Sequence, residues 1–263
     1  MVSALSLMKH PYSKHTPSHT AEHSKKSRVN KRHMLDNSLA LLGGICIFFI
    51  LILGAFSIMI YYKGFYTTEY EKNNVYQNMV SRGYAATPTD AELIAQNITT
   101  NTLQYFRGKD ALHYFTPEEQ SHLQDVKSLI STMNALYYGS VVIFILLLIG
   151  FYIRYKKDMI HFIRLLSRMV LIGSIAALIL IIAIFLLAVF YFNPTFILFH
   201  LLFFPQGNWI FANTSLLITL FPEQFFFDIT LRIFVYALAQ AAVFLIIGWW
   251  LSKQVKLHEE WHQ

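Results

Sequence analysis

The longest charge-free stretch of the sequence begins MVLIGSIAALILIIAIFLLAVFYF, residues 169–192, and it decides the fold class. A membrane-spanning helix needs about 20 predominantly apolar residues, because the hydrocarbon core is about 30 Å thick and a helix rises about 1.5 Å per residue. Three other runs meet this requirement, at residues 38–62, 135–153 and 231–251. The sequence therefore predicts an all-α integral membrane protein, with four transmembrane helices inside a membrane domain of residues 37–252.

The composition agrees with this prediction. Of the 263 residues, 55% are hydrophobic and only 14% are charged, against about 25% charged in an average soluble domain. This balance excludes an ordinary soluble globule and also a disordered chain. The single cysteine, Cys46, excludes an intrachain disulfide.

The distribution of charge predicts the topology. Basic residues dominate the segment 1–36 and the connection 154–168, and positive charge marks the cytoplasmic side. Four membrane passes place both basic segments on the cytoplasmic side if both termini are cytoplasmic. We therefore expect a multi-pass protein of the cell membrane. We expect a disordered, basic and His-rich tail at 1–36 and a second cytoplasmic tail at 253–263. The cytoplasmic position of the basic segments is enough to explain the positive net charge. We therefore expect the lipid bilayer as a partner and no nucleic acid.

Residues 63–134 would then lie outside the cell, and they are too numerous for a bare loop. The sequence TDAE at residues 89–92 is a capping box before an apolar run that Gly108 can end. The sequence TPEE at residues 116–119 is a second helix start, which can run straight into the second span. The segment is therefore predicted to form a small, mostly helical extracytoplasmic cap.

A second outer segment, residues 193–229, is rich in aromatic residues. The Asn-Pro pair at 193–194 is expected to end the third span, because the residue before proline disfavours helix. The apolar run 195–204 is only about half a membrane crossing, and Pro205 follows it. We predict an interfacial segment that packs under the cap, since its backbone needs polar partners at that depth.

Three histidines fall in the outer segments, and His200 stands out among them. It lies in FHLLFF, residues 199–204, where an ionisable ring is costly without a partner. An ionisable residue near the membrane is by default a candidate functional residue. Burial would keep the imidazole neutral and able to accept a proton. The alternative is that His200 only anchors the backbone.

His122 would share one helix face with carboxylates three or four residues away, such as Glu119 and Asp125. A carboxylate can raise the pKa of an imidazole and fix its tautomer. The simpler alternative is an ordinary polar helix surface. His113 has no such setting and is expected to be a surface or packing residue.

Several enzyme classes lack their motifs. The sequence has no G-x-S-x-G nucleophile motif and no H-E-x-x-H metal motif. A zinc site built from His122, His200 and an acidic residue has no support from spacing, and we expect neither a metal nor another cofactor. No charge lies within the predicted spans, so nothing indicates an ion path.

Five stretches together resemble a known family. They are GFY at 64–66, FTPEEQSHLQDVK at 115–127, FHLLFF at 199–204, NWIF at 208–211 and LITLFPEQFF at 217–226. In this order they resemble the signature of the bacterial lipoprotein intramolecular transacylase (Lit) family of four-pass membrane proteins.

The resemblance implies a reaction. The substrate would be a lipoprotein whose N-terminal cysteine carries a diacylglyceryl thioether and a free α-amine. The enzyme would move the sn-2 acyl chain to that amine and give a lyso-form lipoprotein. Neither a covalent acyl-enzyme nor a cofactor is needed, which agrees with the missing nucleophile motif.

The resemblance also implies a site. His122 and His200 would form a catalytic pair of acid and base, in an order that the sequence leaves open. Asp125 or Glu119 would orient His122. If the helix that begins near residue 117 runs straight into the second span, His122 stands about 20 Å above residue 135. Charge stops after Lys127, so the membrane edge can lie nearer Ile130; otherwise that helix bends or the aromatic segment rises to meet it.

The remaining site residues would hold the substrate. Asn208 and Trp209 would position it or donate hydrogen bonds to the oxyanion. The predicted pocket lining is aromatic: Phe199, Phe203, Phe204 and Phe211.

Three other readings remain open. One is a metal-dependent membrane hydrolase that uses both histidines and a carboxylate. Another is a non-catalytic four-pass scaffold whose outer cap binds a partner, in which case the histidines would be dispensable. A transporter is the least favoured, because the predicted spans are neither charged nor broken.

Overall fold

The structure, a computed structural model, describes the backbone of residues 19–261 and the side chains of residues 30–261. The chain divides into two compact units, residues 1–39 and 40–263. The tail prediction for residues 1–18 lies outside the described residues. From His19 onward the structure differs from the predicted disorder, because this part of the tail is the first half of a helix. Residues 19–36 contain no glycine or proline that would interrupt it.

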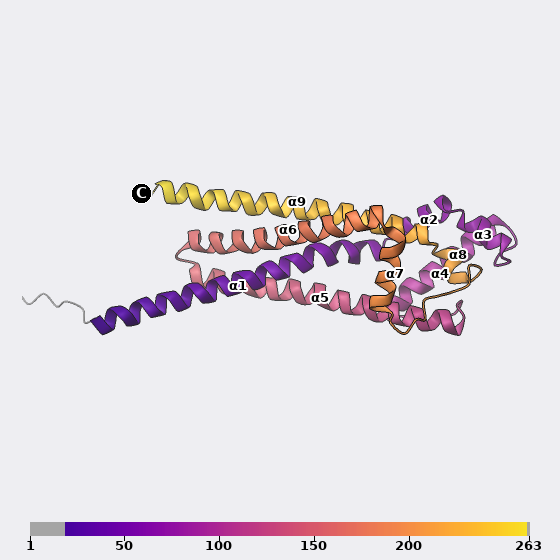
Figure 1. Cartoon of the computed structure of the whole chain (residues 1–263), viewed down its shortest axis with the longest axis horizontal. Coiled ribbons are helices and arrows are strands. Elements are labelled where there is room, and N and C mark those ends of the chain that lie inside the picture. The colour runs from indigo at the N-terminus through magenta and orange to yellow at the C-terminus, as the bar shows by residue number, and fades with distance from the viewer. Residues whose placement is uncertain (1–18, 262–263) are drawn as a thin grey trace, which may run out of the picture. The chain divides into compact units, whose positions relative to one another are not determined.

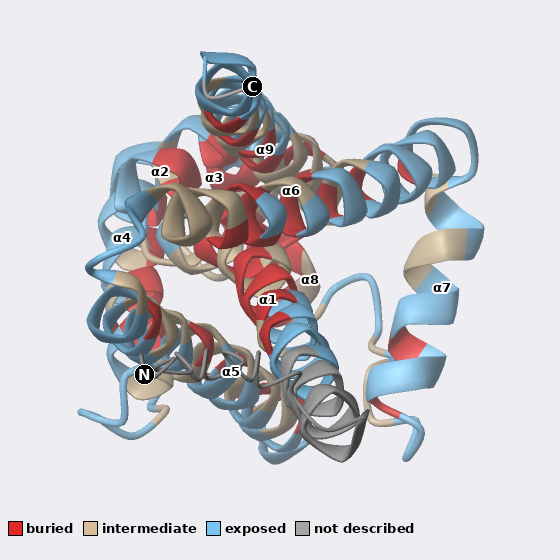
Figure 2. Cartoon of the chain, turned by 90° about the vertical axis from the view of Figure 1, so that its left-hand side faces the viewer, coloured by how far each residue is buried: buried red, intermediate tan, exposed pale blue. Residues whose placement is uncertain are grey.

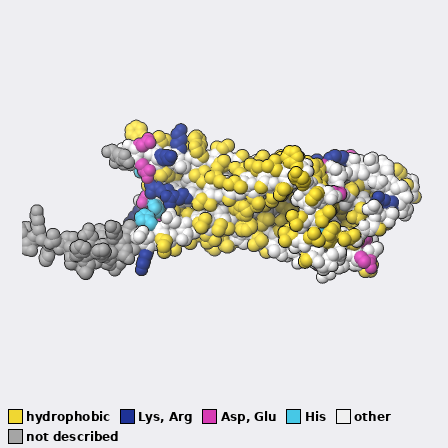
Figure 3. Space-filling model, viewed as in Figure 1, with side chains coloured by type: hydrophobic (Ala, Val, Ile, Leu, Met, Phe, Trp, Pro, Cys, Tyr) yellow, Lys and Arg dark blue, Asp and Glu magenta, His cyan; other side chains and the backbone are white. Residues whose placement is uncertain are grey.

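Four long helices confirm the predicted fold class. They are α1 (His19–Ile60), α5 (Pro117–Tyr155), α6 (Met159–Phe190) and α9 (Glu223–Trp261). Each of them contains a segment long and apolar enough to cross a membrane. The face shown in Figure 3 carries hydrophobic side chains along the middle of the bundle, with Lys and Arg near its ends. This pattern is typical of a surface that faces lipid between two aqueous layers.

Small residues let the spanning helices pack closely. A Cβ at Gly173 of α6 would lie 2.5 Å from the backbone oxygen of Gly44 in α1, so only glycine permits this approach. Close backbone contact of this kind is typical of helix packing in membranes. The buried cluster around it is aliphatic and comes from α1, α6 and α9: Ile47, Leu51, Ala55, Ala177, Ile181, Ala237 and Ala241.

Short helices form a cap at one end of the bundle (Figure 1). They are α2 (Lys63–Lys72), α3 (Val75–Ser81) and α4 (Pro88–Phe106). Aromatic and aliphatic side chains of these helices share one core with Phe221 and Phe225 of the aromatic segment. The expected packing between the cap and this segment is therefore present.

Of the two predicted helix starts in the cap, one is confirmed and one is displaced. The capping box at residues 116–119 is present, with reciprocal hydrogen bonds between Thr116 and Glu119. The box predicted at residues 89–92 is wrong, because α4 begins two residues earlier. Its N-cap is Thr87, whose hydroxyl accepts a hydrogen bond from the backbone of Asp90, and proline occupies the first helical position.

The aromatic segment forms α7 (Phe192–Phe203), an irregular loop and α8 (Leu216–Leu220) before α9 begins. The third span ends at Phe190, slightly before the predicted Asn-Pro pair, and Pro194 lies in the first turn of α7. Proline is tolerated there because first-turn N–H groups have no partner inside the helix. α7 runs across the bundle from the end of α6 towards α5 (Figures 1 and 2).

Candidate active site

His200 is the one buried residue of α7, with 7% of its surface exposed. The rest of this helix is half-buried or exposed (Figure 2). The His200 Nδ1 atom lies 2.7 Å from the backbone oxygen of Phe196, one turn earlier. A carbonyl oxygen can only accept, so Nδ1 carries the hydrogen and Nε2 of the neutral ring is an acceptor. Burial lowers the pKa of His200 against the opposing effect of this hydrogen bond, which favours the neutral ring.

His122 lies on the second turn of α5, which the capping box at residues 116–119 starts. It precedes the membrane-spanning part of α5, because Lys127 is the last charged residue before that apolar run. The imidazole is 8% exposed, and its Nδ1 atom is buried without a hydrogen-bond partner. Burial, and secondarily the facing His200, lower the pKa of His122 from 6.5 to about 4, against the opposing charge of Asp125.

The two imidazoles meet although they lie far apart in the sequence. Their ring centroids are 6.1 Å apart and their planes are inclined by 23°. Phe204 packs against both rings, at 4.9 Å from His122 and 5.7 Å from His200. α5 is one uninterrupted helix, and α7 with its following loop lies beside its first turns. The aromatic segment therefore contacts the first turns of α5 at His122, with no interruption of that helix.

Asp125 does not orient His122 through a hydrogen bond in the described structure, contrary to the prediction. Its Oδ2 atom accepts hydrogen bonds from the side-chain amides of Gln206 and Asn208, each at 2.6 Å. Asn208 also donates to the hydroxyl oxygen of Ser121 at 3.2 Å. Asp125 therefore ties the loop after α7 to α5, because a carboxylate is the strongest acceptor available to these amides.

Glu119 also has a different role from the one predicted. It is 1% exposed, and its two oxygens accept hydrogen bonds from the backbone of Thr116 at 2.9 Å and of Leu217 at 2.8 Å. The first bond completes the cap of α5 and the second joins α5 to α8. Both carboxylates thus build the frame that brings the histidine-bearing segments together.

Trp209 lies beside His200, and the neighbouring Asn208 contacts the first turns of α5. The indole ring of Trp209 lies 4.8 Å from the His200 ring, and its Nε1 atom is buried without a partner. The Oδ1 atom of Asn208 is also buried and unpartnered. Together with Nδ1 of His122 itself, this region contains three buried polar atoms without a partner. Unsatisfied buried polar groups are rare and call for a partner, and a bound substrate can supply it.

The predicted aromatic residues lie at different distances from the two imidazoles. Phe199 lies 5.5 Å from the His200 ring and Phe211 lies 5.7 Å from the His122 ring. Phe203 contacts Phe199 and is 45% exposed. Phe196, which was not predicted, lies with its ring 4.3 Å from that of His200. The spacing of four residues on one helix could have identified it.

The other predicted features lie away from the pair. His113 is exposed and its Nε2 atom lies 3.2 Å from Asp110, as expected of a surface histidine. A metal-dependent hydrolase would need a third ligand beside His122 and His200. Within residues 30–261, no group of three or more His, Cys, Asp or Glu side chains is placed to hold an ion.

Comparisons with known proteins agree on one family. The family model described as lipoprotein intramolecular transacylase Lit matches residues 41–226. The solved structure of the membrane-integral Lit from Bacillus cereus superposes with a TM-score of 0.72 at 22% identity, covering 86% of this chain and 99% of that chain.

Two variants of the Bacillus cereus enzyme give similar values. The variant with one histidine replaced by arginine has a TM-score of 0.70 at 21% identity and covers 89% of this chain and 99% of that chain. The corresponding alanine variant has a TM-score of 0.69 at 22% identity and covers 88% and 99%. A search of curated proteins found no match. At these identities the structural likeness establishes the fold.

Proposed function

The chain belongs to the lipoprotein intramolecular transacylase Lit family, and we propose that it moves the sn-2 acyl chain of a diacylglyceryl lipoprotein to the α-amine of the N-terminal cysteine. The protein is thus a membrane acyltransferase, and its product under this proposal is a lyso-form lipoprotein. The observation that carries the proposal is the pair of buried imidazoles, 6.1 Å apart and enclosed by aromatic side chains.

The proposed reaction needs little from the protein. The neutral amine nitrogen attacks the ester carbonyl carbon, the new C–N bond forms, and the bond from that carbon to the glyceryl oxygen breaks. One proton leaves the nitrogen and one joins the glyceryl oxygen. Because the amine itself is the nucleophile, no acyl-enzyme is formed. Positioned proton acceptors and donors typically contribute about 10²–10⁴-fold to such a step.

We assign the proton acceptor to His200. Its Nδ1–H group is committed to the Phe196 carbonyl oxygen, which leaves the lone pair on Nε2 for the amine proton. We assign proton return to the glyceryl oxygen to His122, whose Nδ1 atom is buried without a partner. The pair returns to the neutral state once the proton accepted by His200 has replaced the proton that His122 donates.

Trp209 and Asn208 divide the remaining polar tasks. The indole N–H of Trp209 can donate to the developing oxyanion, since it is buried beside His200 without another acceptor. The amide nitrogen of Asn208 is committed to Asp125 and Ser121. Its unpartnered oxygen can therefore accept a hydrogen bond from a substrate N–H group.

The surrounding aromatic rings would hold amine and ester together. Orientation of two reacting groups in one pocket can supply several kcal/mol of the barrier, roughly 7–11 at most. Exposed apolar side chains of α7, such as Leu198 and Leu202, would reach lipid, while Gln206 and Asn208 lie at the polar edge. We propose that this edge is extracytoplasmic, with both termini cytoplasmic, because the basic connection at residues 154–168 belongs on the inner side.

Expression in a bacterial strain that makes diacylated lipoproteins tests the function. Mass spectrometry of N-terminal lipopeptides should show the sn-2 chain transferred to the amine in cells that carry the protein. Lipoproteins that stay diacylated with a free amine, in cells that contain the folded protein, would contradict the proposal. If the conversion persists after replacement of both histidines, the two-histidine mechanism is wrong.

A further inference from the structure

A hollow of about 710 Å³ lies on the cap side of the histidine pair, between the start of α5 and the loop that leads to α8. We propose that it binds the first residues of the polypeptide that follows the lipidated cysteine, which makes it the peptide subsite of this enzyme. The proposal rests on the proposed transacylase function. It adds a binding site for the part of the substrate that does not react.

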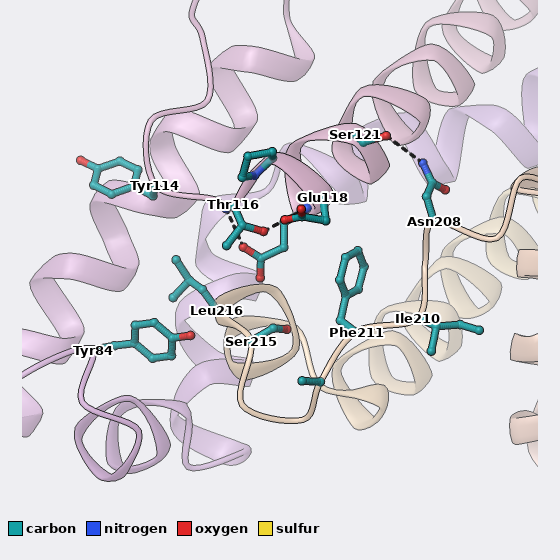
Figure 4. A pocket seen from close by; sticks show the side chains of 13 residues that line it. Tyr84, Tyr114, Thr116, Glu118, Ser121, Asn208, Ile210, Phe211, Ser215 and Leu216 are labelled. Atoms are coloured by element: carbon teal, nitrogen blue, oxygen red, sulfur yellow. Dashed lines mark hydrogen bonds between the residues drawn. The ribbon is translucent and has the colours of Figure 1, made fainter.

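The hollow shares residues with the histidine site. Ser121, Asn208 and Phe211 line it, and Phe211 also packs against His122 at 5.7 Å. Figure 4 shows Asn208 reaching Ser121 at one side of the hollow, with Tyr84 at the opposite side. A chain that starts at the histidines can therefore continue into the hollow past Asn208.

The unpartnered oxygen of Asn208 supports this path. Its Oδ1 atom is buried and accepts no hydrogen bond in the described structure. Two hydrogen bonds of its amide nitrogen, to Ser121 and Asp125, fix the direction in which the oxygen points. A backbone N–H of the substrate peptide is a donor of the required kind, because each residue other than proline carries one.

The lining suits a peptide better than an acyl chain. Part of its lining is polar, with hydroxyl groups from five residues: Tyr84, Tyr114, Thr116, Ser121 and Ser215. Its remaining surface includes apolar side chains: Ile210, Phe211, Ala212 and Leu216. A mixed lining matches a polypeptide, which offers backbone polar groups and small side chains, better than it matches an acyl chain, which offers no polar group to the hydroxyls or to Glu118.

The charge of the hollow predicts which peptide substrates bind best. The lining contains two carboxylates, Glu118 and Glu119, and no basic residue. Both oxygens of Glu119 are engaged with backbone N–H groups, and Glu118 is exposed. A substrate with an acidic residue soon after the cysteine should therefore bind less well than its amide counterpart.

The first test fills the hollow. Purified protein in detergent micelles is given S-diacylglyceryl-cysteine amide, or the same lipid on the peptide Cys-Ser-Asn-Ser-Gly. Conversion is followed by mass spectrometry. In Ala212→Trp, the ratio of kcat/KM for the peptide substrate to that for the short one should fall about tenfold, because the indole occupies the peptide's space.

A matched control is available on the same cap. A second hollow, of about 520 Å³, is lined by Ala86 and Leu93 and lies against α4. Ala86 is exposed, as Ala212 is, so Ala86→Trp introduces the same side chain at a hollow away from the histidines. In Ala86→Trp, the ratio of kcat/KM for the peptide substrate to that for the short substrate should equal the ratio of the unmodified protein.

The second test uses charge and does not depend on filling space. Replacing the asparagine of the peptide substrate by aspartate should lower kcat/KM about threefold, as expected of an exposed charge interaction. Glu118→Lys should reverse this preference, whereas Glu92→Lys on the exposed face of α4 should leave it unchanged. Thermal unfolding in the same micelles verifies that each variant is folded.

The outcomes separate the subsite from the function. If the unmodified protein converts neither substrate, the proposed function fails and the subsite with it. Suppose that it converts both substrates, that Ala212→Trp leaves the peptide-to-short ratio of kcat/KM unchanged, and that Glu118→Lys leaves the preference for asparagine over aspartate unchanged. The peptide subsite is then wrong and the transacylase proposal stands. If Ala212→Trp does not fold, an unchanged preference in Glu118→Lys is sufficient to overturn the subsite.

Discussion

Two buried polar clusters of this protein differ in how their atoms are satisfied. The first joins α2 to α9, where Glu69 and Asp228 are 2% and 8% exposed. Asp228 accepts hydrogen bonds from Lys72 at 2.7 Å and from Gln224 at 3.2 Å, and Arg232 lies 3.7 Å from Glu69. Burial and the hydrogen bond with Asp228 raise the pKa of Glu69.

The second cluster joins α5 to α7 and the loop after it. Here His122, Asn208 and Trp209 each carry a buried polar atom without a partner. The first cluster satisfies its charges within the protein and therefore fits a structural junction between cap and bundle. The second leaves hydrogen-bonding capacity for another molecule, which fits a site. Four predictions test this distinction, in order of decreasing effect on turnover.

The largest effect is expected from the histidines. His200→Ala and His122→Ala should each lower the rate of acyl transfer by about 10²–10⁴-fold, because each removes a positioned proton acceptor or donor. Rates are measured by mass spectrometry of the lipopeptide product, with protein shown to be folded by its thermal transition. His113→Ala, on the exposed part of the cap, is the control and should retain full activity. Equal activity in all three variants would remove the basis for the site.

Trp209→Phe should lower kcat by about 10²-fold, because it removes one proposed oxyanion donor while keeping an aromatic ring beside His200. KM should change little, since the donor acts mainly in the transition state. Trp249→Phe, on an exposed position of α9, provides the same change elsewhere. A variant at Trp209 whose KM rises with unchanged kcat would contradict the oxyanion role and indicate ground-state binding.

The pH dependence should show no inflection near the ordinary histidine value. Burial lowers the pKa of His122 to about 4 and lowers the pKa of His200 below its ordinary value, so neither ring should become charged at pH 6.5. As the pH falls from 8 to 6.5, log(kcat/KM) should decline with a slope of about one, from protonation of the substrate amine alone. A slope that already steepens near 6.5 would show that the rings are not desolvated.

The smallest effect on turnover is expected at the junction cluster. Asp228→Ala should destabilise the protein by about 1 kcal/mol, because it removes the nearest carboxylate of half-exposed Lys72 and a hydrogen-bond partner of buried Glu69. Thermal unfolding in micelles measures this loss. The activity per folded molecule should stay within about twofold of the unmodified protein. Loss of turnover in a variant with an unchanged thermal transition would mean that this cluster also serves the reaction.

Local sequence signals predicted the parts of the structure that depend on neighbouring residues. The capping box at residues 116–119 set the start of α5, since its hydrogen bonds form within one turn. The cap helix α4 was misplaced by two residues, because Thr87 followed by proline outcompeted the box at residues 89–92. The roles of Asp125 and Glu119 were also misread, because helical spacing shows which residues share a face but not which distant amides reach them.

The sequence by itself determined that this chain spans a membrane four times and carries a histidine in each of two unusual segments, because apolar length and turn residues act over short range. Only the tertiary structure decided that the two rings stack and that the carboxylates bind the loop instead of the histidine. It also decided that a hollow continues from Asn208 into the cap. Each of these depends on contacts between α5, α7 and α8, which no local pattern encodes.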